Sequence, residues 1–122
     1  MSLINYMDEA VELLEYAFCK LLSKTKIHDA HELILPDRVS DNCYSSMFDG
    51  CKSLTTAPAL PATSLAMSCY YNMFQGCTSL TAAPALPATT MVRLCYDAMF
   101  INCTSLTQAP ALPATTMANG CY

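Results

Sequence analysis

The most reactive side chains in this chain belong to eight cysteines and two histidines. His28 and His31 flank Asp29 in the cluster HDAHE, and histidines three residues apart can share a metal ion on one face of a helix. No helical pattern surrounds this cluster, and no pair of cysteines lies near it in sequence. We therefore interpret it as a solvated loop, with a metal site as the alternative.

Cys19 is the remaining candidate for a reactive group. A catalytic thiol needs an electropositive setting, whereas Cys19 follows Phe18 in a stretch that is rich in acidic residues. We therefore predict that the chain is not an enzyme and that it has no catalytic residue, metal or cofactor. An enzyme or metal protein that uses Cys19, His28 and His31 remains the alternative from another class.

The other seven cysteines occupy two positions of a tandem repeat. Residues 69–94 read CYYNMFQGCTSLTAAPALPATTMVRL, residues 43–68 and 95–120 are similar copies, and a fourth copy opens at 121–122. A period of 26 residues indicates stacked, structurally equivalent units. The repeat places the cysteines in two columns, namely Cys43, Cys69, Cys95 and Cys121, and Cys51, Cys77 and Cys103.

These columns predict ladders of buried, reduced thiols. Equivalent residues of stacked strands lie roughly 4.8 Å apart, and a free cysteine packs well as a small apolar side chain. Disulfides or a metal remain the alternative. A column of tyrosines, which includes Tyr70, should stack in the same way with each hydroxyl reaching solvent.

Within each unit, apolar spacing predicts one short helix. Tyr70, Met73, Phe74 and Cys77 follow the spacing i, i+3, i+4, i+7 of a one-sided helix. Gly or Asn ends this pattern in every copy, which indicates the positive φ of a helix C-terminus. These residues are Gly50, Gly76 and Asn102.

The second half of each unit predicts a brief strand. The leucine after the second cysteine of each unit should point inward, and the proline four residues later should end the strand because proline cannot donate to a ladder. These residues are Leu54, Leu80 and Leu106, and Pro58, Pro84 and Pro110. We therefore predict an α/β solenoid, a right-handed superhelix with short parallel strands on one side and short helices on the other.

The residues before the repeats predict an N-terminal cap. Apolar residues that step by three and four over 3–24 predict an amphipathic helix, so residues 1–26 should cover the open end of a solenoid over 27–122. An intermolecular helical seam is the alternative. Residues 27–42 form a degenerate first unit, in which Leu35 lies eight residues before Cys43 whereas Leu60 lies nine before Cys69.

Composition restricts the partners. The net charge is −4 and the repeats are almost neutral, so we predict no binding to nucleic acid. No apolar run approaches the roughly 20 residues that span a bilayer, so no membrane insertion is expected. The N-terminus does not resemble a signal peptide, which predicts a cytoplasmic protein if Met1 is the native start.

One motif resembles a known family. Cys77-Thr78-Ser79-Leu80, followed by Leu86-Pro87 and Met99-Phe100-x-x-Cys103, is similar to the register of BspA-like leucine-rich repeats of bacterial surface antigens. The resemblance covers about residues 33–122, although the unit is longer and has Ala and Pro where that family prefers isoleucine. It implies binding or adhesion at a cell surface or after secretion, not catalysis.

The positions that differ between copies are the best candidates for a binding surface, because packing does not fix them. We predict a protein-interaction or adhesion module of the leucine-rich repeat class with a protein or cell-surface ligand. The alternative is a self-assembling structural fragment of a longer surface protein, which would associate through its uncapped C-terminal end or its N-terminal helix. The candidate residues are Ser45, Thr56, Tyr71, Asn72, Gln75, Asp97 and Gln108.

Overall fold

The computed structural model describes residues 15–122, and this part of the chain contains no helix and no extended strand. Isolated parallel bridges join Asp29 to Thr56 and Thr90 to Thr116. The prediction of an α/β solenoid with short helices and short strands is therefore wrong, and with it the assignment to leucine-rich repeats.

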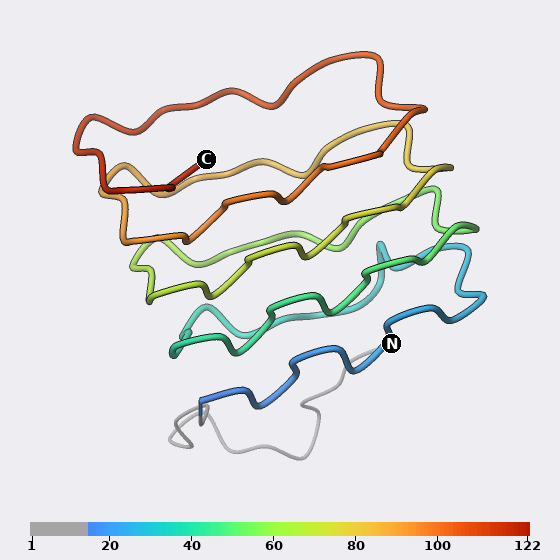
Figure 1. The fold of residues 1–122 in the computed structure, drawn as a ribbon, viewed down its shortest axis with the longest axis horizontal. Helices are drawn as coiled ribbons and strands as arrows, with labels where there is room; N and C mark the ends of the chain where they lie inside the picture. Colours follow the sequence, from blue (N-terminus) through green and yellow to red (C-terminus); the bar gives the residue numbers. More distant parts are fainter. Residues whose placement is uncertain (1–14) are drawn as a thin grey trace.

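Consecutive tight turns take the place of the predicted helices. Residues 16–24, 42–50, 68–76 and 94–102 are turns and bends, and we call them the turn segments. Figure 1 shows these zigzag runs lying side by side in sequence order, each joined to the next by a returning run. The stack of the four turn segments is named the turn wall.

Backbone hydrogen bonds in the turn wall alternate between two directions. Odd-numbered residues donate within their own segment, as from Met47 N–H to Tyr44 O at 3.2 Å. Even-numbered residues donate to the next segment, as from Tyr44 N–H to Cys69 O at 2.9 Å and from Phe48 N–H to Met73 O at 2.9 Å. Because neighbouring segments satisfy each other's buried backbone groups, each turn segment is stable only as part of the stack.

A positive φ at every fourth residue produces the turns. In residues 68–76 the φ angles are 53° at Ser68, 54° at Asn72 and 74° at Gly76. Each of these residues is the third of its turn, and the second residue has no positive φ. This is the pattern of a type II turn, which favours Gly and Asn at the third position. The prediction of positive φ at Gly50, Gly76 and Asn102 is confirmed, but these residues lie in turns and do not end helices.

The turns direct side chains alternately into the core and outward in pairs. Cys69 and Tyr70 are fully buried, the next two residues are half-buried, and Met73 and Phe74 are again fully buried. This pattern repeats at i, i+3, i+4 and i+7, which is also the spacing of a one-sided helix. The helix prediction failed because apolar spacing does not distinguish the two structures.

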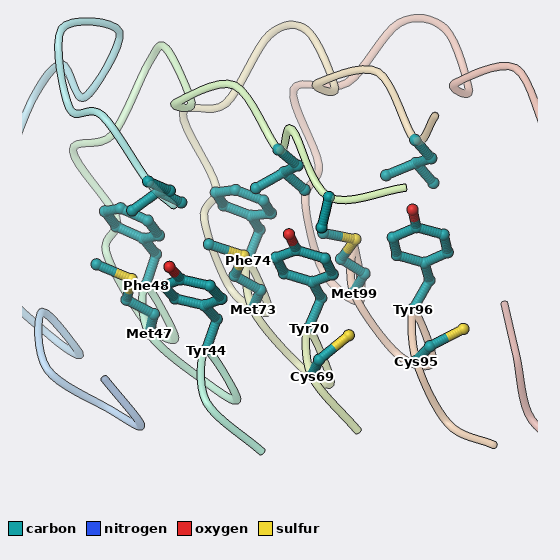
Figure 2. Packing of buried hydrophobic residues seen from close by; sticks show 14 of the residues in the cluster. Tyr44, Met47, Phe48, Cys69, Tyr70, Met73, Phe74, Cys95, Tyr96 and Met99 are labelled. Atoms are coloured by element: carbon teal, nitrogen blue, oxygen red, sulfur yellow. The ribbon is translucent and has the colours of Figure 1, made fainter. Parts of the chain in front are cut away.

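Equivalent side chains stack from layer to layer in the core (Figure 2). The ring centroids of Tyr44 and Tyr70 are 5.6 Å apart with an interplanar angle of 7°, and those of Phe48 and Phe74 are 5.4 Å apart. Offset stacking at this separation is favourable for aromatic rings. The predicted stacking of the tyrosine column is confirmed.

The hydroxyl groups of this column do not reach solvent, contrary to prediction. The side chains of Tyr44 and Tyr70 are fully buried, and their hydroxyl oxygens have no hydrogen-bond partner. Burial raises the pKa of both phenols far above the usual value.

Residues 15–24 form turns, so the helix predicted over residues 3–24 is absent from this stretch. The rest of that predicted helix lies outside the described residues. Phe18 N–H donates to Cys43 O at 2.8 Å, and the Phe18 ring stacks on Tyr44 at 5.5 Å. Residues 16–24 are therefore the first layer of the turn wall, while the division of the chain at residue 26 stays a prediction.

The returning half of each unit completes the core without forming a sheet. Leu54, Leu60, Leu80 and Leu86 are at most 4% exposed. The prediction that the leucines after the second cysteine point inward is confirmed for Leu54 and Leu80, whereas Leu106 is only partly buried. Few backbone hydrogen bonds join the returning halves of neighbouring units. One of them runs from Met91 N–H to Thr116 O at 2.8 Å. The repeated prolines in these segments cannot donate, which prevents a continuous ladder.

Candidate interaction surface

The outward positions of the turn wall form the surface that best fits the predicted binding residues. Tyr71, Asn72 and Gln75 lie in one turn segment, are half-buried, and alternate with fully buried pairs. Asp97 belongs to the next segment, where its carbonyl accepts the Asn72 N–H at 3.1 Å. The wall therefore brings these four residues onto one face of two adjacent layers.

Ser45 belongs to the same column but contributes little surface. Its layer precedes that of Tyr71, and Ser46 N–H donates to Tyr71 O at 2.8 Å. Ser45 itself is only 8% exposed. Its side chain therefore offers little surface to a partner.

Thr56 and Gln108 lie apart from the turn wall. Both follow the inward leucine of their returning half, and both are exposed. Thr56 O accepts the Ala30 N–H at 2.9 Å, and Gln108 lines a shallow hollow of about 160 Å³ together with Thr81 and Thr107. The seven candidate residues therefore occupy two separate surfaces.

The cysteine columns are structural in character. All eight cysteines are free thiols. Cys77 donates to Phe48 O at 3.1 Å and Cys103 to Phe74 O at 3.0 Å, so these thiols bond to the preceding layer.

Burial keeps these thiols protonated. It raises the pKa of Cys69 and of Cys77 to about 12. Because the thiolate is the nucleophilic form, both thiols are unreactive at neutral pH.

The histidine cluster is a solvent-exposed pair. Asp29 Oδ2 lies 2.7 Å from His31 Nδ1, and the His31 N–H donates to Asp29 Oδ1 at 2.9 Å. These hydrogen bonds, the backbone one first, lower the pKa of the Asp29 carboxyl. Among residues 15–122, no group of three His, Cys, Asp or Glu side chains is arranged to hold a metal ion.

Sequence reasoning missed the first layer of the wall, although a signal for it exists. Phe18 lies 26 residues before Tyr44, and Leu22 lies 26 residues before Phe48. Aligning residues 17–42 as a full repeat unit would have placed Lys20 and Lys24 on the wall with the later copies. The amphipathic spacing of this stretch concealed that relationship.

Comparisons of the chain with protein-family models, with curated proteins and with solved structures give no match. The similarity to BspA-like repeats therefore rests on the motif alone. In the described range no helix is long and apolar enough to cross a membrane.

Proposed function

We propose that this chain is a non-catalytic interaction or adhesion module that binds a protein or cell-surface ligand through the outer face of its turn wall. The observation that carries this proposal is the contrast between the two sides of the wall. The inward positions repeat the same residue types in full burial, as at Met47 and Met73. The outward column of Ser45, Tyr71 and Asp97 changes from layer to layer.

The backbone supports such a role, because the wall is held in register by hydrogen bonds from one layer to the next. A surface that is ordered before binding loses less conformational entropy on association. Tyr71 supplies an aromatic side chain with a polar end, which is the type enriched at binding hot spots. Asn72 and Gln75 add hydrogen-bond donors and acceptors beside it.

The test is photo-crosslinking followed by measurement of affinity. A benzoylphenylalanine placed at Tyr71 should capture a partner from native extract, whereas the same group at the exposed Thr104 should not. The purified partner should then bind the Asn72→Ala, Gln75→Ala double variant at least about tenfold more weakly, as expected for loss of roughly 1.4 kcal/mol. An unchanged dissociation constant would exclude this surface.

Self-association is the second candidate function, and one observation favours it. Leu112 and Met117 in the last returning half are 56% and 62% exposed, whereas their equivalents Leu86 and Met91 are 4% and 5% exposed. Light scattering of the 122-residue chain should show a mass that rises with concentration. A constant monomer mass would count against this candidate.

A further inference from the structure

One hollow lies between residues 37–40 of the first unit and residues 61–64 of the second, outside the turn segments. Its volume is about 570 Å³, and it is lined by Asp37, Arg38, Val39 and Ser40 on one side and by Pro61, Thr63 and Ser64 on the other. This volume is within the range of roughly 300–1,000 Å³ that is typical of small-molecule sites.

A shortened connection coincides with this hollow. Leu35 and Leu60 are equivalent buried residues, at 4% and 3% exposure. Ser40 and Ala66 are also equivalent, since each accepts the N–H of the first cysteine of the following turn segment, at 3.2 and 3.3 Å. Four residues separate Leu35 from Ser40, whereas five separate Leu60 from Ala66. The connection from Leu35 to Ser40 is therefore one residue shorter than its equivalent, and it borders the hollow.

Most of the polar side chains around the hollow are exposed. Arg38 and Asp37 are exposed and form no ion pair within the described part of the chain. The Ser40 hydroxyl oxygen is buried without a hydrogen-bond partner. Because this oxygen is closed to solvent, the polar side chains that a ligand can reach in the hollow are those of Asp37, Arg38, Thr63 and Ser64.

We propose that this hollow binds an acidic saccharide of the hexuronic acid type. The guanidinium of Arg38 matches a carboxylate in bidentate geometry. The neighbouring Asp37 carboxylate repels a multiply charged phosphate but accepts hydrogen bonds from sugar hydroxyls. Thr63 and Ser64 add exposed hydroxyls that both donate and accept, while Val39 and Pro61 offer apolar surface to the C–H face of a sugar ring.

The test is a titration of the isotope-labelled 122-residue chain, followed by NMR. D-glucuronate should shift the amide signals of Arg38, Ser40, Thr63 and Ser64 with a dissociation constant on the order of 1 mM, a weak affinity typical of an open site with few contacts. D-glucose and acetate should each bind at least about tenfold more weakly. Equal binding of acetate would reduce the site to a general anion site, and equal binding of glucose would remove the role of Arg38; either result overturns the proposal.

Three variants locate the binding in the hollow. Arg38→Gln should weaken glucuronate binding at least about tenfold, as expected for loss of a charge-assisted hydrogen bond, whereas Arg93→Gln, at the only other arginine, should leave it unchanged. Inserting one alanine between Arg38 and Val39 gives this connection the length of its equivalent between Leu60 and Ala66, and it should abolish binding. Unchanged glucuronate binding in the Arg38 variant or in the insertion variant would refute the site. Because neither change touches the turn wall, the result is independent of the protein-binding proposal.

Discussion

At the scale of single residues, the tyrosine column combines favourable stacking with unfavourable burial of polar groups. Tyr70 stacks on both neighbours, at centroid separations of 5.6 Å to Tyr44 and 5.7 Å to Tyr96. Its hydroxyl is nevertheless buried without a partner. The ring therefore stabilises the core while the hydroxyl lowers the free energy of unfolding.

Removing this hydroxyl should increase stability. We expect Tyr70→Phe to raise the free energy of unfolding by about 1 kcal/mol, because an unsatisfied buried polar group is removed and the stacked ring is kept. Chemical denaturation monitored by circular dichroism measures the change. Tyr71→Phe, at the half-exposed neighbouring position, is the control and should have little effect. A clear loss of stability in Tyr70→Phe would show that the hydroxyl contributes favourably to the fold.

At the scale of elements, a turn segment and a helix require different residues at the same positions. Ala98 lies within the helix that apolar spacing predicts, yet its φ is 56° in a turn. An L-amino acid pays roughly 1–2 kcal/mol in this left-handed region. Glycine avoids that cost, whereas in a helix interior it is about 1 kcal/mol worse than alanine.

The sign of the stability change caused by one substitution therefore distinguishes a turn segment from a helix. We expect Ala98→Gly to stabilise the chain by about 0.5–1 kcal/mol, in denaturant unfolding, because it relieves the positive φ. Gly76→Ala should destabilise by about 1 kcal/mol through its φ of 74°, since the added Cβ meets nothing closer than 3.6 Å.

Ala109→Gly, at an exposed position without positive φ, controls for the flexibility that glycine adds to the unfolded chain. Destabilisation by Ala98→Gly to the same extent as in this control would contradict the turn geometry.

At the scale of the whole molecule, each layer of the core adds thiols that are held in the protonated form. Burial raises the pKa of Cys43 to about 11 and that of Cys69 and Cys77 to about 12, from an ordinary value of 9.0. Above pH 9 the unfolded chain releases these protons while the folded chain retains them. Rising pH therefore favours unfolding.

Stability should accordingly be constant from pH 7 to about pH 8 and then fall as the pH rises from about 9 toward 12. Each such thiol contributes up to about 1 kcal/mol per pH unit in this window, and the buried tyrosines act in the same direction. Unfolding by guanidinium under reducing conditions at several pH values measures the slope. Cys69→Ala should lessen the slope. A free energy of unfolding that does not change up to pH 10.5 would contradict this account.

Several features could be predicted from the sequence because they depend on side-chain type and period. The 26-residue repeat gave the inward positions, as at Met73 and Leu80, since burial follows apolar character wherever a unit stacks on its copies. The Gly and Asn column gave the positive φ, because few other residues accept that angle without strain. Variation between copies pointed to Tyr71, Asn72, Gln75 and Asp97, which the wall brings together.

The tertiary structure alone decided what the repeat is made of. A turn segment and a short helix share the same apolar spacing, and hydrogen bonds between residues 25 apart, such as that from Phe48 to Met73, determine which of them forms. Such bonds exist only after the layers have stacked, so no local pattern reports them. Three further features depend on packing in the same way and could not be predicted from local patterns. They are the first layer over residues 16–24, the separation of Thr56 and Gln108 from the wall, and the hollow beside Arg38.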